Sequence, residues 1–192
     1  MMLYSKDVLS RNQGAKIIFD VKCTSLLPKF ITENGGEPIM SRTGHSFIKQ
    51  KLKETKAELA GEMSGHIFFK ERWYGFDDAL YSGARLLEII SKSDKTCSEI
   101  FDEMPVNIST PEININFEKH GQQFEAMEQL STNINFPGAT INTIDGVRVD
   151  YENCWGLVRA SNTTPCLVLR FEADDDEVLL EIKTKFKEWL ES

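Results

Sequence analysis

Ile17-Ile18-Phe19-Asp20-Val21 is the clearest strand signal in the first half of this chain. A short apolar run of this kind is typical of a strand that is buried on both faces, as the strands of parallel sheets are. Similar short runs follow at 38–41 and 57–60, and segments with helical spacing alternate with them. This β-α-β-α-β order predicts a parallel sheet that is flanked by helices.

The segments with helical spacing in this half are 3–12, 26–34, 47–52 and 78–90. Gly14 and Gly35 follow the first two segments as stop signals. The last helix is expected to carry Leu80, Ala84 and Leu87 inward, onto the sheet.

The pattern changes after Pro105, where short strand-like segments follow one another closely. Asp145-Gly146 between two of these segments is a strong hairpin signal. Helices are expected near 117–130 and 176–190. These features predict an α+β domain with an antiparallel sheet. We therefore expect an α/β domain at 1–95, a linker at 96–105 and a smaller α+β domain at 106–192.

The composition excludes several classes of protein. A net charge of −8 over 192 residues argues against a non-specific nucleic-acid partner, which needs a basic face. No apolar run approaches the roughly 20 residues that span a bilayer, and the start lacks the pattern of a signal peptide. That lack of a long apolar run predicts no membrane partner. The four cysteines are scattered, so we expect reduced thiols, a cytosolic location and no metal site. Asp174-Asp175-Asp176 lacks metal-ligand spacing and suits the start of a helix instead.

Polar side chains follow three predicted strands of the first domain, at the point where each strand ends. Because the carboxyl ends of parallel strands meet at one edge of a sheet, these residues are expected at a common rim, where ligands bind. The residues are Lys22, His45, Glu62, Ser64 and His66. A carboxylate and a hydroxyl can recognise the hydroxyl groups of a sugar. The alternatives are that Glu62 and Ser64 cap the next helix, and that each histidine is structural.

A second candidate is the loop from Arg159 to Pro165. Arg159 ends a predicted strand and can bind phosphate with two parallel hydrogen bonds. Ser161 and Thr163 add hydroxyl donors, and Asn162 tolerates the left-handed conformation that forms an anion-binding nest. The alternative is a plain hairpin turn with a surface arginine. Both loops must face one cavity if a single phosphosugar is to touch them.

Together these motifs resemble those of the α-D-phosphohexomutases, and most of all the bacterial enzymes with dual phosphomannomutase and phosphoglucomutase activity. The motifs are Asp20-Val21-Lys22-Cys23-Thr24, Ser41-Arg42-Thr43-Gly44-His45, Gly61-Glu-Met-Ser-Gly-His66, Trp73-Tyr-Gly-Phe-Asp-Asp78, Ser82-Gly-Ala-Arg85 and the loop from Arg159 to Pro165. The resemblance covers essentially the whole chain. It implies the third and fourth domains of a four-domain enzyme, with the third domain truncated at its N-terminus.

The resemblance also implies roles for the candidate residues. Glu62 and Ser64 would bind sugar hydroxyl groups, and Lys22, His45 and His66 would line the same cleft. His66 would be a candidate for proton transfer. The residues that would hold the phosphate that is not transferred are Arg159, Ser161, Asn162 and Thr163.

The phosphoserine loop and the magnesium loop of this family are absent from the sequence. The resemblance implies a parent enzyme that interconverts hexose 1-phosphate and hexose 6-phosphate through a bisphosphate, with Mg²⁺ as cofactor and glucose 1,6-bisphosphate as activator. This chain would hold no cofactor of its own, and its partner would be the missing N-terminal half of the same polypeptide. Because phosphoryl transfer needs the donor and the metal, the isolated chain is expected to be inactive.

Two alternatives stay open at this point. The chain could be a stand-alone phosphosugar-binding module without catalytic activity. It could also fold without binding any ligand measurably, because half of the cleft wall is missing.

Overall fold

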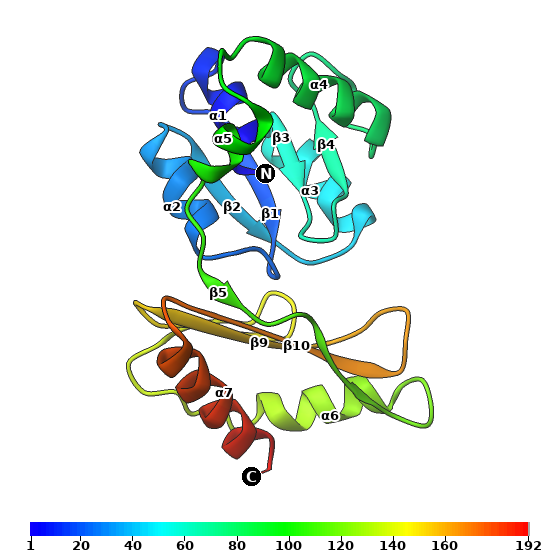
Figure 1. Cartoon of the computed structure of the whole chain (residues 1–192). Coiled ribbons are helices and arrows are strands. Elements are labelled where there is room, and N and C mark those ends of the chain that lie inside the picture. The colour runs from blue at the N-terminus through cyan, green and yellow to red at the C-terminus, as the bar shows by residue number, and fades with distance from the viewer. Residues whose placement is uncertain (192) are drawn as a thin grey trace. The chain divides into compact units, whose positions relative to one another are not determined.

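The computed structural model describes residues 1–191, which form two compact units (Figure 1). The first unit is Met1–Val106 and the second begins at Asn107. The segment expected to be a linker, 96–105, contains a helix, α5 (Cys97–Asp102), and lies within the first unit. This helix forms because Thr96 and Glu99 make a capping box, in which each side chain bonds the backbone N–H of the other.

The first unit is built on a sheet with the strand order β2-β1-β3-β4. Its strands are β1 (Lys16–Asp20), β2 (Glu37–Ser41), β3 (Leu59–Gly61) and β4 (Ile67–Phe69). Its other helices are α1 (Met2–Arg11), α2 (Leu26–Glu33), α3 (His45–Thr55) and α4 (Ala79–Ser91). The first three strands are parallel, which confirms the predicted sheet, and β4 adds an antiparallel edge that was not predicted.

Strand β1 is covered on both faces, as its apolar run predicts. Ile17 and Phe19 pack with α1 and α2, whereas Ile18 packs with α3 on the opposite face. Side chains of a strand alternate between its faces, so consecutive apolar residues supply two cores at once. The carboxyl ends of β1, β2 and β3 consequently share one edge of the sheet.

Helix α4 has the opposite orientation from the one predicted. Leu80 and Leu87 are 89% and 68% exposed, and Ala84 is exposed as well, whereas Ser82 and Arg85 are buried. The inward face is polar because Arg85 reaches two carboxylates of other elements, Asp7 and Glu71. Separating any of these charges from its partners inside the protein would be costly, and this cost is larger than the gain from burying the leucines.

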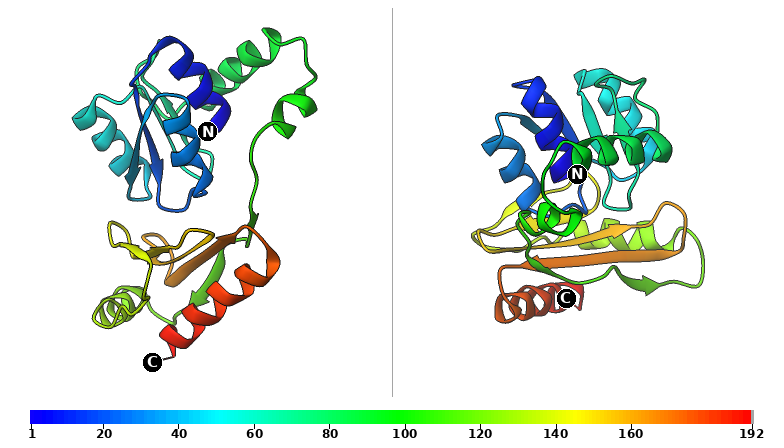
Figure 2. Two further views of the ribbon diagram at one scale, coloured as in Figure 1. Left: turned by 90° about the vertical axis from the view of Figure 1, so that its left-hand side faces the viewer. Right: turned by 45° about the horizontal axis from the view of Figure 1, so that its top comes forward.

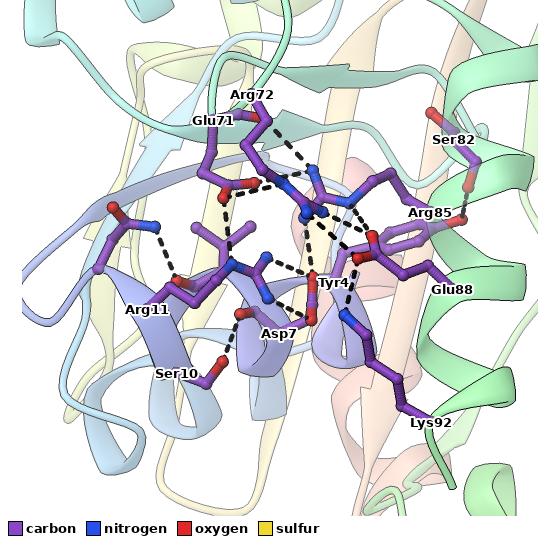
Figure 3. A network of polar contacts seen from close by, with 12 residues as sticks. Tyr4, Asp7, Ser10, Arg11, Glu71, Arg72, Ser82, Arg85, Glu88 and Lys92 are labelled. Carbon is purple, nitrogen blue, oxygen red and sulfur yellow. Dashed lines mark hydrogen bonds and ion pairs between the residues drawn. The ribbon is translucent and has the colours of Figure 1, made fainter.

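Arg85 lies at the centre of a network of ion pairs (Figure 3). Its side chain is 3% exposed, its Nη2 donates to Asp7 at 2.8 Å, and its Nη1 lies 2.8 Å from Glu71 Oε2. The guanidinium carbon lies 4.4 Å from the centre of the Phe69 ring, a favourable cation–π distance. Arg11 contacts both carboxylates from the other side. The network therefore joins α1, α4 and the segment that follows β4.

The network predicts that acid destabilises the first unit. Hydrogen bonds from Arg11, opposed in part by burial, hold the pKa of Asp7 below its ordinary value of 3.8. Hydrogen bonds from Arg72 and Lys92 lower the pKa of Glu88 to about 2. Because the folded pKa values lie below the unfolded ones, this stability is complete above about pH 5 and is lost as the pH falls toward about 2.

The measurement is the urea midpoint of the first unit, followed by its own NMR signals at several pH values. We expect the midpoint to fall steadily below about pH 4. Asp7→Asn should lower the midpoint at neutral pH and reduce the additional loss in acid. A midpoint that stays constant down to about pH 3 would contradict the prediction.

The second unit has an antiparallel sheet with the strand order β5-β10-β9-β8-β7, and β6 also pairs with β10. Its elements are β5 (Ile108–Ser109), β6 (Ile113–Asn116), α6 (Gln122–Ser131), β7 (Thr140–Asn142), β8 (Val147–Asp150), β9 (Cys154–Ala160), β10 (Cys166–Ala173) and α7 (Asp176–Leu190). Helices α6 and α7 lie on one face of this sheet (Figure 2). The predicted antiparallel domain is confirmed.

The core of the second unit lies between this sheet and its helices. Ile182, Phe186 and Trp189 of α7 pack on Val158 and Phe171. The side chain of Asp175 accepts a hydrogen bond from the N–H of Val178 and caps α7, as expected for acids at the start of a helix.

In the part of the chain that the structure describes, no helix has the length and apolarity needed to cross a bilayer.

Candidate functional site

The turn 62–66 joins β3 to β4 as a tight hairpin. Gly61 pairs with Ile67, the N–H of Glu62 donates to the carbonyl of His66 at 2.9 Å, and the N–H of Gly65 donates to the carbonyl of Glu62 at 3.0 Å. Gly65 has a φ of 95°, a conformation that other residues rarely adopt. Three of the predicted site residues, Glu62, Ser64 and His66, therefore sit in one short turn at the strand-end edge.

Glu62 is 4% exposed, and both of its carboxylate oxygens are hydrogen-bonded. Its Oε1 accepts from the N–H of Gly44 at 3.0 Å, and its Oε2 accepts from the hydroxyl of Ser64 at 3.3 Å. A carboxylate has about four acceptor positions, so these two bonds leave capacity for the hydroxyl groups of a ligand. The two bonds also fix the direction of the side chain. Neither side chain caps the next helix along the chain, α4, which is capped by Asp78; Glu62 instead bonds Gly44, the N-cap residue of α3.

Asp20 connects three loops at the strand-end edge. It is fully buried at the end of β1, and its Oδ1 accepts from the N–H of Met63 at 3.1 Å, while its Oδ2 accepts from the hydroxyl of Thr43 at 3.1 Å. The thiol of Cys23 also donates to Oδ1 at 3.1 Å. The loops after β1 and β2 and the turn after β3 are therefore held together by one carboxylate. The strand-end pattern predicts that these loops share one rim, but it assigns no role to Asp20.

Cys23 is held as a thiol by the same carboxylate. Burial and the neighbouring charge of Asp20 raise the pKa of this thiol well above its usual value. A thiol that donates to a carboxylate is a poor nucleophile. Cys23 therefore belongs to the support of the loops.

His66 is paired with Asp77, a residue to which no local sequence pattern assigns a role. The Nδ1 atom of His66 lies 2.6 Å from Oδ2 of Asp77. Since a carboxylate only accepts hydrogen bonds, Nδ1 carries the proton and Nε2 is the nitrogen that can accept one. Asp77 is placed here by a β-bridge between its backbone and that of Phe68. The arrangement suits a histidine that exchanges a proton with a ligand hydroxyl.

The remaining predicted residues of this unit lie on the neighbouring loops. Lys22 follows β1 and is 7% exposed. His45 is the first residue of α3, directly after Gly44, whose N–H binds Glu62. The strand-end edge thus brings Lys22, His45 and the turn 62–66 onto loops that Asp20 and Glu62 join.

The loop between β9 and β10 is organised from inside by Ser161. Its Oγ accepts from the N–H of Thr163 at 3.4 Å and from the N–H of Thr164 at 3.2 Å. Asn162 keeps a negative φ, so the left-handed nest expected at this residue does not form. The serine side chain closes the turn instead, as serine often does. Asn162 and Thr163 are exposed on the surface of the loop.

Gln123 of α6 supports this loop from the helical side. It is fully buried, and its Nε2 donates to the carbonyls of Ser161 and Thr164 at 3.2 Å and 3.4 Å. A glutamine on an amphipathic helix carries no local sign of such a contact, since its partners lie 38 and 41 residues away.

Arg159 precedes the loop and is not a surface residue. Its Nε donates to Oδ2 of Asp145 at 2.9 Å, and the two side chains are 6% and 7% exposed. No other side-chain hydrogen bond of Arg159 is present among residues 1–191. The two terminal nitrogens, Nη1 and Nη2, therefore donate to no side chain in the described part of the chain.

Three hollows of the second unit lie away from these loops, with volumes of 370, 450 and 530 Å³. They are lined mainly by side chains of α6, α7 and the sheet that they cover, among them Leu130, Leu169 and Trp189. No predicted site residue lines them. Across the described residues, no group of three His, Cys, Asp or Glu side chains is placed to hold a metal ion.

Two protein-family models match the chain in the order of its two units. The model of phosphoglucomutase/phosphomannomutase alpha/beta/alpha domain III matches residues 1–107, and the model of the phosphoglucomutase/phosphomannomutase C-terminal domain matches residues 112–188. The chain belongs to the phosphoglucomutase/phosphomannomutase family. The first unit is domain III of this family, and the second is its C-terminal domain.

Individual members of the phosphoglucomutase/phosphomannomutase family agree with this assignment. A phosphomannomutase/phosphoglucomutase of Pseudomonas putida is 58% identical over 187 residues, which are 97% of this chain and 40% of that protein. A phosphoglucomutase of Neisseria gonorrhoeae is 57% identical over 193 residues, 100% of this chain and 42% of that protein. A family member from Burkholderia thailandensis has a crystal structure that matches 98% of this chain and 40% of its own, with a TM-score of 0.91 at 50% identity. The chain spans about 40% of the length of the curated relatives it matches.

Proposed function

We propose that this chain is the sugar-recognition and phosphate-clamp part of a phosphohexomutase that interconverts hexose 1-phosphate and hexose 6-phosphate through a bisphosphate. The observation that carries the proposal is the fixed, buried carboxylate of Glu62 in a turn that also contains Ser64 and His66. Membership of the family supports the reaction class.

The first unit would bind the sugar. Glu62 and Ser64 would accept and donate hydrogen bonds to its hydroxyl groups, with Lys22 and His45 on the adjoining loops. His66, oriented by Asp77 through Nδ1, would take up or return a proton at Nε2 as a sugar hydroxyl reacts. The protein contribution at this end is therefore orientation and proton transfer.

The second unit would bind the phosphate that is not transferred. Arg159 would offer its two terminal nitrogens, and Ser161, Asn162 and Thr163 would form the adjoining loop. Ser161 would act mainly by shaping the loop, because its oxygen already accepts from Thr163 and Thr164.

The parts that transfer the phosphoryl group would belong to the rest of the parent enzyme. Mg²⁺, supplied with the phosphoserine there, would neutralise charge on the transferred phosphate. The donor set of this chain does not fit that metal, since the described residues contain no suitable cluster. Its partners would be a hexose phosphate and the missing N-terminal half, in the cytosol, with glucose 1,6-bisphosphate as activator.

A mutase assay tests the division of labour. The purified chain with glucose 1-phosphate, glucose 1,6-bisphosphate and Mg²⁺ is expected to show no turnover, because it lacks the phosphoryl donor. Clear turnover would overturn the proposal. The reading frame directly upstream distinguishes it from a stand-alone module: an in-frame extension with the serine and magnesium loops supports the mutase.

A titration tests binding by the chain itself. Arg159→Ala is expected to lower the affinity for both inorganic phosphate and glucose 1-phosphate by roughly 10- to 100-fold, since it removes two hydrogen bonds from a charged donor. Glu62→Gln should lower the affinity for glucose 1-phosphate and leave the affinity for inorganic phosphate unchanged, because Glu62 would contact only the sugar. NMR shifts of the loop amides report both affinities. Equal binding of both ligands by all three proteins would contradict the assignment.

A further inference from the structure

We propose that Asp145 is a positioning residue that orients the Arg159 guanidinium for phosphate. The inference rests on the proposed function, in which Arg159 holds a phosphate. Asp145 lies in the turn between β7 and β8, one strand away from Arg159. Nothing in the local sequence around this turn indicates a contact with the phosphate loop.

The geometry of the pair defines which edge of Arg159 is free. Asp145 accepts from Nε at 2.9 Å, on the flank of the guanidinium. Phosphate can pair with either the flank or the end of an arginine, and here the flank is occupied. The end that carries Nη1 and Nη2 is thereby directed to the ligand. Both side chains are more than nine-tenths buried, so the bond is protected from water.

The turn that carries Asp145 is packed directly against Arg159. Gly146 has a φ of 79°, and a Cβ at this position would lie 2.2 Å from the carbonyl oxygen of Val158 and 2.6 Å from Cα of Arg159. Only glycine permits this approach, which explains the Asp145-Gly146 pair as more than a hairpin signal. This backbone contact fixes the position of the Asp145 carboxylate relative to the Arg159 guanidinium.

Two opposite effects on phosphate affinity follow from such a pair. The carboxylate cancels part of the arginine charge, and this effect alone would weaken the binding of an anion. It also removes the rotational freedom of a long side chain, which would otherwise be lost on binding. Because Arg159 is buried and bonds no other side chain in the described chain, we expect the ordering effect to be larger.

Arg148 and Asp150 provide a matched control pair in the same sheet. Arg148 is 1% exposed, donates to Asp150 from Nε at 3.0 Å and from Nη2 at 2.9 Å, and lies 3.9 Å above the Trp155 ring. Both its flank and its face are used within the fold. This pair is therefore structural, and its loss should leave phosphate affinity nearly unchanged.

The experiment compares Asp145→Asn with Asp150→Asn in the complete chain. Asp145→Asn is expected to lower the affinity for inorganic phosphate and for glucose 1-phosphate by about 3- to 10-fold. Asp150→Asn should lower both affinities by less than about twofold. In a chain that already carries Arg159→Lys, Asp145→Asn should have no further effect. Unchanged or tighter binding by Asp145→Asn would overturn the inference, because neutralisation would then be the larger effect.

A second readout separates this inference from the proposed function. The Nε–H NMR signal of Arg159, assigned through Arg159→Lys, is expected to exchange slowly in the original chain and to broaden in Asp145→Asn. Sheet amide signals report whether each variant is folded. If the original chain binds neither ligand, the proposed function fails, and an Nε–H signal that is unaltered by Asp145→Asn refutes the positioning role independently.

Discussion

Replacement of Arg85 by alanine is expected to lower the free energy of unfolding of the first unit by about 3–5 kcal/mol. The substitution leaves the partly buried carboxylate of Asp7 and the buried carboxylate of Glu71 without their central partner. It also removes the guanidinium from the ring of Phe69. Breaking a buried ion network is costly because Arg85 is its buried cation, and Arg11, which still contacts both carboxylates, is 33% exposed and cannot replace the buried guanidinium.

Arg72→Ala is the matched control. Arg72 pairs with Glu88, which Arg85 also contacts, but its side chain is 44% exposed. Its loss should cost less than about 1 kcal/mol, as for other surface ion pairs. Urea unfolding of the first unit, followed by its NMR signals, measures both variants. Similar losses for Arg72→Ala and Arg85→Ala would show that burial does not control the strength of the network.

The second large effect is expected for Asp20→Ala, which should cost about 3 kcal/mol. The change removes the carboxylate that accepts from the N–H of Met63, the hydroxyl of Thr43 and the thiol of Cys23. The loss of hydrogen bonds in a buried or partly buried place is costly, since water replaces the lost acceptor only in part. Affinity for glucose 1-phosphate should fall with stability, because the turn containing Glu62 loses its link to β1.

Asp20→Asn separates the two consequences. The amide keeps the shape and one acceptor oxygen, so stability should fall by less than in Asp20→Ala, while one of the three donors still loses its partner. The amide shift of Met63 and the urea midpoint are the measurements. A Met63 signal that is unaltered by Asp20→Ala would mean that this carboxylate does not hold the turn.

Much of the fold could be predicted because its signals are local. The double-sided burial of β1 and the length of α7 follow from the spacing of apolar residues, which depends only on the near sequence. The same reasoning failed for α4. There the spacing of Leu80 and Leu87 predicted that these side chains face the sheet, but the ion pairs of buried Arg85 determined which face of the helix is turned inward.

The candidate site divides in the same way. Glycines and polar residues at strand ends marked the turn 62–66 and the loop after β9 in advance. The sequence assigned no role at the site to Asp20, Gln123 or Asp145. Asp20 and Gln123 contact the loops from distant parts of the chain, 43 residues from Met63 and 38 residues from Ser161, and Asp145 bonds Arg159 from the preceding hairpin turn.

Local sequence patterns were enough to predict the two kinds of sheet, their order along the chain and the turns that offer polar groups to a ligand. The folded chain was needed to show which face of α4 is buried, which nitrogen of Arg159 is bonded to Asp145 and which carboxylate joins the three loops. The difference lies in the range of the interactions. Hydrophobic periodicity and turn preferences act over a few neighbouring residues, whereas buried hydrogen bonds and ion pairs depend on partners that the folded chain alone brings together.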